Sequence, residues 1–502
     1  MAATESYPWQ DTASAEKALI DIATLRGRGL APPFSLRLSG AGPDNLLVCT
    51  AILRHLPGKR LVCRASRRHG QAVIAKIFLD PRQARRHLQR EINGLTALKA
   101  VQLPTPEVLF RGTLDDGQTP LLLLTAIPDA GSLADRWAGL NKTQRGAHLN
   151  RCIELLAQLH AGGWRQRDIH PGNFLVAGSA IYLVDGDDVR TLGPGPFGAE
   201  RQCLANLALF LVQFDPDSDR LVGTALETYC RQRGWTDGPR RRQRLERMMR
   251  HCRYKRMRHF AAKVARPCTA VTVRQVWRRY TACDRNWYSA EILPLLSDPD
   301  RYMEKGDLIK TGNSATVAQI TFQGRVLVVK RYNIKNFRHR LRRCLRPSRG
   351  MLAWRSAHML RLIGIPTARP LALIEERWGP LRSRAFLICA HQPGSRLADY
   401  WKTDWEAQDP RTEALESLSV LLRRLAGAQI SHGDKKATNL IFDGRAIALV
   451  DLDGLRVCRS VRSFKRHFRK DCRRLLQNWH RHPNIFHDLR QMLNDPGITG
   501  TD

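Results

Sequence analysis

The chain has 502 residues, more than one hydrophobic core usually supports, so we expect two domains. Its composition, 43% hydrophobic and 25% charged, excludes a disordered, fibrous or membrane-spanning protein. The net charge of +36 calls for an anionic partner, and charge alone does not choose among nucleic acid, acidic lipid head groups and phosphorylated sugars.

Cysteine usage and the apolar runs indicate the compartment. The twelve cysteines form no CxxC pair, which favours reduced thiols over disulfides or a zinc site. The first residues show no basic segment followed by an apolar core, and the longest apolar runs, 121–127 and 204–210, are too short to span a bilayer. We expect a cytoplasmic protein whose contact with the inner face of the cytoplasmic membrane is peripheral.

The first predicted elements form a strand-rich segment. Strand-like runs flank a turn at 57–59, a weak candidate for a nucleotide-covering hairpin because it lacks a full GxGxxG. An apolar strand at 72–76 ends in Lys76, a helical stretch with Glu91 follows, and a buried strand at 121–125 leads to a hinge.

A polar loop follows the next helical stretch. The loop at 166–176 carries Asp168 and Asn173, and the strand at 181–184 is followed directly by Asp185. Turn-forming residues at 293–300 then separate this half from a second strand-rich segment. The predicted domains are 1–290 and 301–502, with a linker at 291–300.

The second half repeats this order. A turn at 310–314 precedes an apolar strand that ends in Lys330, and a buried strand lies at 386–389. The polar residues Asp434, Asn439 and Asp451 repeat Asp168, Asn173 and Asp185 at a constant offset of 266. This duplicated set of polar residues indicates two related units, each a strand-rich lobe followed by a helical lobe.

These residue types suit phosphoryl transfer, which needs charge neutralisation and alignment more than covalent help. A lysine on a strand (Lys76, Lys330) can hold nucleotide phosphates. An aspartate on a short loop (Asp168, Asp434) can orient the acceptor hydroxyl as catalytic base. Asparagine and aspartate oxygens are ligands that Mg²⁺ prefers; the predicted metal ligands are Asn173, Asp185, Asn439 and Asp451. A lone motif could equally be a solvated strand end and a turn, but a duplicated set favours a kinase.

The duplicated polar residues and three other segments resemble the protein-kinase-like superfamily and, within it, the lipopolysaccharide core kinases of the Kdo/WaaP family. The three segments are Val329–Asn333, Gly364–Thr367 and Lys470–Leu476. The resemblance covers nearly the whole chain, once in each half. It implies an α+β fold of two tandem bilobal kinase-like domains, Mg-ATP as cofactor, and phosphorylation of a lipid-linked core sugar, heptose or Kdo.

The two halves depart differently from the family pattern. A helix glutamate that pairs with the strand lysine is expected, and Glu91, thirteen residues before Pro104, suits Lys76. The matching position in the second half is Ala353, so we expect the first site to be the better catalyst. Lys436, two residues after the catalytic aspartate, is expected to lie at the nucleotide, whereas the first half has a histidine there.

Basic runs at 240–258, 338–343 and 465–470 are either solvated helix faces or contacts for an anionic acceptor at an acidic membrane surface. A nucleic-acid partner is not expected, since no reading helix, zinc module or stacking motif is recognisable. Two alternatives stay open: a protein or small-molecule kinase such as an antibiotic phosphotransferase, and a pseudokinase scaffold for core-assembly enzymes.

Overall fold

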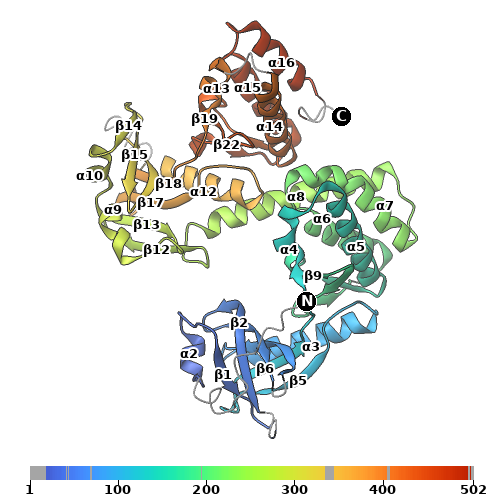
Figure 1. Ribbon diagram of the computed structural model, residues 1–502. Helices are drawn as coiled ribbons and strands as arrows, with labels where there is room; N and C mark the ends of the chain where they lie inside the picture. The colour runs from blue at the N-terminus through green and yellow to red at the C-terminus, as the bar shows by residue number, and fades with distance from the viewer. Residues whose placement is uncertain are drawn as a thin grey trace, which may run out of the picture. The chain divides into compact units, whose positions relative to one another are not determined.

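The computed structural model describes residues 19–40, 42, 45–67, 70–193, 195–333, 344–403, 408–495 and 498. The fold is α+β, and the chain divides into two compact units (Figure 1). The first comprises Met1–Phe210 and Leu221–Leu245, and the second Leu211–Arg220 and Glu246–Asp502.

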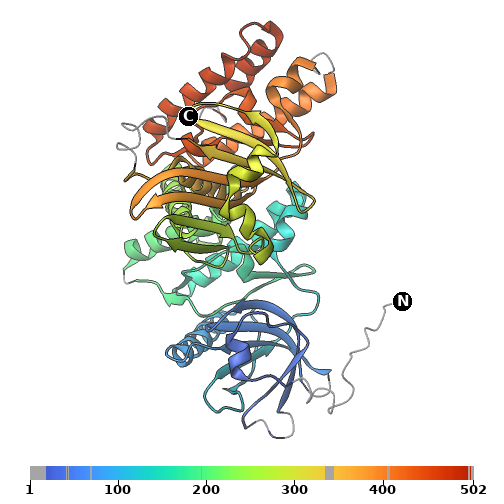
Figure 2. The same cartoon turned by 90° about the vertical axis from the view of Figure 1, so that its left-hand side faces the viewer.

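The first unit opens with a six-stranded antiparallel sheet in the order β1-β2-β3-β4-β6-β5. Its strands are β1 (Phe34–Arg37), β2 (Leu46–Leu56), β3 (Arg60–Ser66), β4 (Ala72–Phe78), β5 (Val108–Thr113) and β6 (Pro120–Thr125). Helix α3 (Ala84–Ala100) covers one face of the sheet at β4 and β6 (Figures 1 and 2).

Alternation along β4 decides where Lys76 points. Val73, Ala75 and Ile77 are buried in the apolar core on one face of the sheet. Because successive strand side chains point to opposite faces, Lys76 lies on the other face, toward α3. The predicted strands at 72–76 and 121–125 and the helical stretch with Glu91 are confirmed.

The rest of the first unit is mainly helical. Its helices are α4 (Leu133–Arg136), α5 (Lys142–Ala161), α6 (Pro196–Leu211) and α7 (Val222–Arg233). Asn141 and Gln144 form a capping box that starts α5. Short strands present the polar loop: β7 (Gly131–Ser132), β8 (Trp164–Gln166), β9 (Phe174–Ala177), β10 (Ala180–Leu183) and β11 (Val189–Thr191).

The second unit has a seven-stranded antiparallel sheet in the order β12-β13-β17-β18-β16-β15-β14. The strands are β12 (Val271–Val276), β13 (Arg279–Asp284), β14 (Asp307–Lys310), β15 (Ala315–Phe322), β16 (Arg325–Tyr332), β17 (Pro370–Trp378) and β18 (Leu381–Ala390). Leu327 and Val329 of β16 lie in one core cluster, which again places Lys330 on the opposite face.

Helix α12 (Arg349–Leu362), capped by Ser348, packs against β17 and β18 and occupies the place that α3 has in the first unit. The helical part that follows contains α13 (Leu397–Thr403), α14 (Gln408–Gly427), α15 (Val461–Leu476) and α16 (Pro483–Leu493). Its short strands are β19 (Ser395–Arg396), β20 (Ile430–Ser431), β21 (Leu440–Phe442), β22 (Ile447–Leu449) and β23 (Arg456–Val457).

The second unit begins earlier than the predicted linker at 291–300. Strand β13 pairs with β17, and the end of α8 (Pro239–Lys263) contributes Met257 to the second core. The linker residues form α9 (Leu293–Ser297) and α10 (Pro299–Glu304), and Leu295 is buried. The prolines and Asp298, read as linker punctuation, stand at the starts of these short helices, and the Asp298 side chain caps α10.

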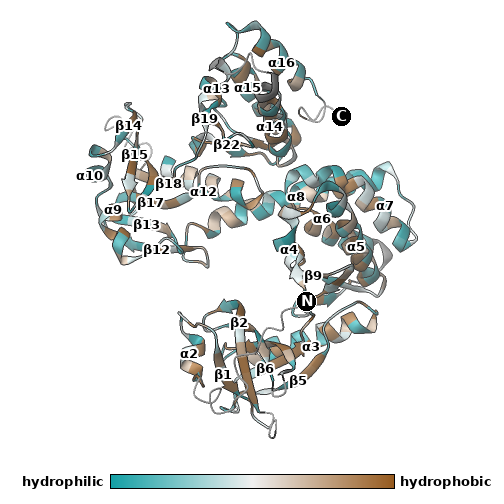
Figure 3. Ribbon diagram, viewed as in Figure 1, coloured by the Kyte–Doolittle hydropathy of each residue, from teal (hydrophilic) through white to brown (hydrophobic). Residues whose placement is uncertain are grey.

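The basic runs fall on different parts of the chain. The run at 240–258 lies in α8, where Figure 3 shows much hydrophilic colour, and the run at 465–470 lies in α15. The run at 338–343 lies outside the described residues. Within the described part of the chain, no helix is both long enough and apolar enough to cross a membrane.

Candidate active sites

In the first unit, Lys76 of β4 contacts Glu91 of α3. The distance from Lys76 Nζ to Glu91 Oε1 is 2.5 Å, and the Glu91 side chain is fully buried. The backbone N–H of Gly186 donates to the same glutamate oxygen over 3.1 Å. Strand, helix and the loop after β10 thus meet at one carboxylate, which fixes the position of the ammonium. Burial raises the pKa of Glu91 despite the attraction of Lys76.

The loop between β8 and β9 holds Asp168 and Asn173 together. The Asn173 side-chain amide donates to the Asp168 carbonyl over 3.0 Å, and Val184 N–H donates to the Asn173 carbonyl over 2.8 Å. Asp185 follows at φ 76°, a left-handed conformation that aspartate tolerates better than most residues. Its carboxylate lies 4.0 Å from Lys76 Nζ, so the strand lysine and the aspartate after β10 lie in the same region.

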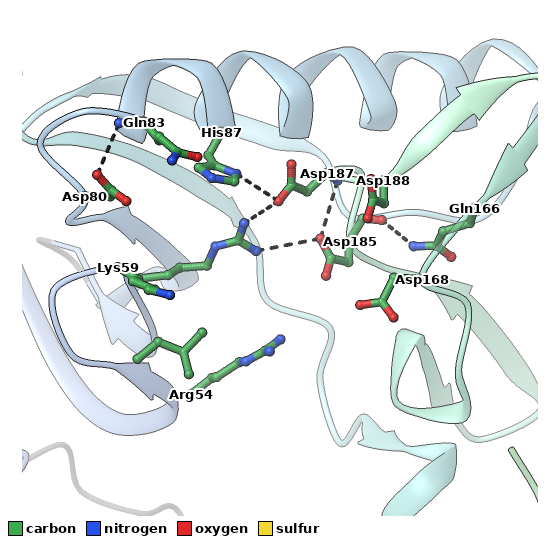
Figure 4. A pocket seen from close by; sticks show the side chains of 12 residues that line it. Arg54, Lys59, Asp80, Gln83, His87, Gln166, Asp168, Asp185, Asp187 and Asp188 are labelled. Carbon is green, nitrogen blue, oxygen red and sulfur yellow. Dashed lines mark hydrogen bonds and ion pairs between the residues drawn. The ribbon is translucent and has the colours of Figure 1, made fainter. Parts of the chain in front are cut away.

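A cavity of about 320 Å³ opens at this region (Figure 4). Asp168 and Asp185 face it from one side, and Arg54 and Lys59 from the covering β2–β3 hairpin. Arg60, which no sequence motif indicates, bonds Asp187 over 2.5 Å and lies 4.0 Å from Asp185. Burial opposes the charge of Asp185, but Lys76, a hydrogen bond with Glu91, and Arg60 outweigh it and lower its pKa to about 2. Asp185 is therefore a carboxylate at any physiological pH.

A buried polar network supports the catalytic loop of the first unit. His160 of α5 bonds Tyr229 over 2.7 Å and Asn206 over 3.0 Å, and Asn206 donates to the Gln166 carbonyl over 2.7 Å. The Gln166 side chain in turn donates to the Asp185 carbonyl over 2.6 Å. The Gln166 amide thus ties the catalytic loop to the metal-ligand candidate.

The buried His160 predicts how the stability of the protein depends on pH. Burial lowers the pKa of His160 to about 4 from 6.5. Between about pH 6.5 and pH 4 the histidine is therefore protonated in the unfolded chain and neutral in the folded chain. The free energy of unfolding decreases as the pH falls through this range. The unfolding temperature of His160→Gln should fall less between about pH 7.5 and pH 5 than that of the wild type, since glutamine does not titrate. The exposed His259→Gln serves as control; equal pH dependence of His160→Gln and wild type would contradict this assignment.

In the second unit, Lys330 pairs with Asp451 instead of a helix glutamate. Ala353 of α12 occupies the position of the glutamate, and Lys330 Nζ makes a short hydrogen bond to Asp451 Oδ1. The ammonium also lies 4.9 Å from the centre of the Tyr332 ring. The counter-charge of this lysine is therefore the predicted metal ligand itself.

Asp451 repeats the conformation of Asp185, with φ 61°. Burial opposes its charge, yet Lys330, a hydrogen bond with Asp453 and the nearby Arg349 lower its pKa to about 2. Arg349, at the first turn of α12, forms an ion pair with Asp453. Asp187 and Asp453, two residues after the metal-ligand candidates, are thus each neutralised by an arginine from the sheet lobe.

The second catalytic loop has cations at its aspartate. Lys436 Nζ lies 3.0 Å from Asp434 Oδ2, and Arg474 Nε lies 3.5 Å from Oδ1. The Asn439 amide donates to the Asp434 carbonyl over 2.9 Å, as in the first loop. The buried Asp471 of α15 accepts from Ser431 Oγ and from two backbone N–H groups, at His432 and Gly433. These bonds fix the start of the loop.

A cavity of about 480 Å³ joins Lys330 and Asp451 to the hinge at 390–392. Apolar side chains line it from both lobes, among them Val317, Leu387 and Ile441. A cavity of this size, with an apolar wall and a few charged groups at one end, is typical of a small-molecule or cofactor site. The turn at 310–314, predicted to cover a nucleotide, contributes Lys310 and Ser314 to the lining.

The structure therefore brings the predicted residues together in two separate sets. Lys76, Glu91 and Asp185 meet in the first unit, with Asp168 and Asn173 tied to each other. Lys330 and Asp451 meet in the second, where Asp434 adjoins Lys436 and Asn439. Sequence reasoning missed Arg60, Arg349, Asp471 and Arg474. For Asp471 and Arg474 a signal existed, since both lie in a segment that carries the family resemblance, Lys470–Leu476.

Known protein families and solved structures were compared with the chain, and the family comparison identifies it. Among solved structures, the chain is similar to "WaaP in complex with acyl carrier protein" (16% identity, TM-score 0.28, covering 40% of this chain and 87% of that one). It is also similar to WbdD (18% identity, TM-score 0.30, covering 41% and 51%). No curated protein matches the chain significantly. The profile of the lipopolysaccharide kinase (Kdo/WaaP) family matches residues 64–191 and 297–494, more than half of the chain. The chain belongs to the lipopolysaccharide kinase (Kdo/WaaP) family, whose members are ATP-dependent kinases.

Proposed function

We propose that the chain transfers the γ-phosphate of Mg-ATP to a sugar hydroxyl, of heptose or Kdo, in the lipopolysaccharide inner core. The observation that carries the proposal is the duplicated set of a strand lysine beside an aspartate, with an asparagine tied to a second, loop aspartate. Family membership supplies the reaction class, and the proposal adds the acceptor and the residue roles.

The roles follow from the chemistry of each group. Lys76 and Lys330 hold nucleotide phosphates, Glu91 positions Lys76, and Asp168 and Asp434 orient the acceptor hydroxyl. The asparagine N–H groups donate to the loop backbone, which leaves their amide oxygens to serve as ligands. Asn173 with Asp185, and Asn439 with Asp451, fit Mg²⁺, which is usually held by one or two carboxylates plus phosphates and water. Bound Mg²⁺ supplies charge neutralisation.

Two tandem kinase units are part of the proposal. Backbone hydrogen bonds repeat with the residues: Leu183 N–H donates to the Pro104 carbonyl, and Leu449 N–H to that of Pro366. These bonds link the strand before each metal-ligand candidate to the segment after α3 or α12. We place the boundary of the second domain before β12, since that hairpin belongs to the second sheet.

Charge beside Asp434 favours an anionic acceptor. Lys436 and Arg474 contact its carboxylate, and Lys470 is exposed one turn earlier on α15. A phosphate or carboxylate on the core sugar would be attracted there, and a lipid-linked acceptor implies work at the acidic inner face of the cytoplasmic membrane. No nucleic-acid partner is proposed. The solved WaaP complex contains acyl carrier protein, so a carrier protein is a further candidate partner.

Removing cations near Asp434 should weaken acceptor binding selectively. Lys470→Ala with Arg474→Ala should raise KM for core oligosaccharide about tenfold in a chain whose first site is disabled, while KM for ATP changes little. Arg462→Ala, at the start of the same helix, is the matched control. Equal increases in both KM values would show that the pair serves the nucleotide or the fold instead.

The direct test of the function is mass spectrometry of core oligosaccharide from a strain that lacks the chain, with and without the purified kinase and Mg-ATP. We expect a core short of phosphate that the wild-type chain restores. An unchanged core, together with no transfer in vitro, would refute the acceptor assignment.

A further inference from the structure

Two hairpin tips of the second unit lie side by side at one end of its sheet. The β12–β13 hairpin turns at Trp277 and Arg278, and the β17–β18 hairpin turns at Gly379 and Pro380. The Gly379 N–H donates to the Trp277 carbonyl over 3.0 Å, and the Arg377 N–H donates to the Arg278 carbonyl over 2.8 Å. The tips therefore form one hydrogen-bonded edge, which we call the tryptophan edge.

The tryptophan edge exposes large apolar side chains. Trp277 is 64% and Trp378 58% exposed, and Val276 and Leu381 beside them are also exposed. Leu345, 71% exposed, adjoins the edge because Arg382 donates to its carbonyl over 3.1 Å. Single exposed apolar residues are ordinary on a protein surface, but several gathered at one edge mark an interaction site.

Backbone geometry fits the exposed ring. Gly379 has φ 55°, and a Cβ at this position would lie 2.8 Å from the Trp277 ring. The glycine thus admits both the turn and the close approach of the indole. The guanidinium of Arg278, which follows Trp277 in the first turn, lies 5.6 Å from the centre of the Trp378 ring on the neighbouring tip. Both indoles are held in place while their outer surfaces stay in water.

The charge around the tryptophan edge is positive. Arg274, Arg278 and Arg346 are exposed there. The nearby acidic groups are already paired, Glu375 with Arg377 and Glu376 with Arg384. A cavity of about 240 Å³ lined by Arg274, Val276 and Tyr288 adjoins β12. The edge therefore combines rings and aliphatic side chains with unneutralised positive charge.

We propose that the tryptophan edge docks on an anionic lipid bilayer. Indole rings settle at the level of lipid head groups, and arginines nearby gain from acidic head groups. The exposed aliphatic side chains Val276, Leu345 and Leu381 beside the rings suit contact with acyl chains. The proposal rests on the proposed function, since a lipid-linked acceptor has to be reached at a membrane, and it names the surface that reaches it.

Vesicle co-sedimentation of the full chain tests the docking surface. We expect binding to vesicles of phosphatidylglycerol and phosphatidylethanolamine, and weak binding to pure phosphatidylcholine. Trp277→Ala with Trp378→Ala should lower the partition coefficient at least about tenfold, since two large exposed rings no longer enter the interface. The control Val461→Ala, which truncates an exposed apolar residue on α15, should bind like the wild type. Unchanged binding by the tryptophan pair would overturn the proposal.

Fluorescence quenching by lipids distinguishes loss of docking from misfolding of the alanine variant. Trp277→Phe with Trp378→Phe keeps aromatic rings at the tips, and should lose most of the fluorescence quenching that lipids brominated in their acyl chains cause in the wild type. Undiminished quenching would refute insertion at this edge. If the wild type ignores vesicles but self-associates, or binds a purified acidic carrier protein, through these two residues, the surface is a protein interface and the proposal is wrong.

Activity on two acceptors separates this inference from the proposed function. The Trp277→Ala, Trp378→Ala chain should phosphorylate delipidated core oligosaccharide as the wild type does, and should be slower only on lipopolysaccharide in vesicles. A wild type inactive on both acceptors would refute the proposed function and leave the vesicle-binding result standing.

Discussion

Phosphate transfer should disappear when Asp168→Ala and Asp434→Ala are combined, while ATP binding survives. An aspartate that orients the acceptor hydroxyl acts mainly in the transition state, and losing both should cost about 10²–10⁴-fold in kcat. The loops should persist, because Asn173 and Asn439 bond the backbone carbonyls of these aspartates and not their carboxylates. The measurement is incorporation of labelled phosphate into core oligosaccharide, beside equilibrium binding of a fluorescent ATP analogue.

The single variants and the metal-ligand candidates complete this test. Each single aspartate variant reports the activity of the other unit. Asp185→Ala and Asp451→Ala should instead weaken binding of Mg-ATP itself, since their carboxylates, with pKa values lowered to about 2, are charged throughout the working pH range. Full phosphate incorporation by the Asp168→Ala, Asp434→Ala chain would show that the bases are assigned wrongly.

Lys76→Met should reduce turnover more than Lys330→Met. Lys76→Met is measured in a chain that carries Asp434→Ala, and Lys330→Met in a chain that carries Asp168→Ala. Each turnover is compared with that of the chain that carries the aspartate substitution alone. Glu91 holds the Lys76 ammonium in place before ATP arrives, so the first site is preorganised. Lys330 is paired with Asp451, and ATP binding has to redirect it and order its long side chain. Losing the charge that stabilises the transition state should cost about 10²–10³-fold at the first site and less at the second. A larger loss from Lys330→Met would reverse this ranking.

Ala353→Glu provides the matched gain of function. Ala353 is buried and lines the 480 Å³ cavity that Lys330 also lines. A glutamate there would recreate the Lys76–Glu91 pair, release Asp451 and raise turnover by the second unit. Ala353→Gln, of nearly equal size without the charge, should not. If neither variant or both raise turnover, the missing carboxylate does not limit the second site.

The sequence by itself predicted the order of elements and the residues of the two candidate sites. Continuous apolar runs ending in Lys76 and Lys330 predicted strands, and the structure has β4 and β16 there. The spacing of Asp168, Asn173 and Asp185 is local, within one loop and the short β9–β10 hairpin, so the sequence could place these residues together. Glu91 was found because the family resemblance implies a helix glutamate that pairs with the strand lysine, and the helical stretch before Pro104 offers one.

Only the tertiary structure decided which distant groups neutralise the acidic residues. Arg60 of β3 reaches Asp187, Arg349 of α12 reaches Asp453, and Lys330 reaches Asp451. The same holds for the β12–β13 hairpin, which joins the second sheet by pairing with β17. Such contacts depend on which strands and helices pack against each other across long stretches of chain. Local propensity and spacing carry no information on that choice, because many pairings would satisfy the same local pattern.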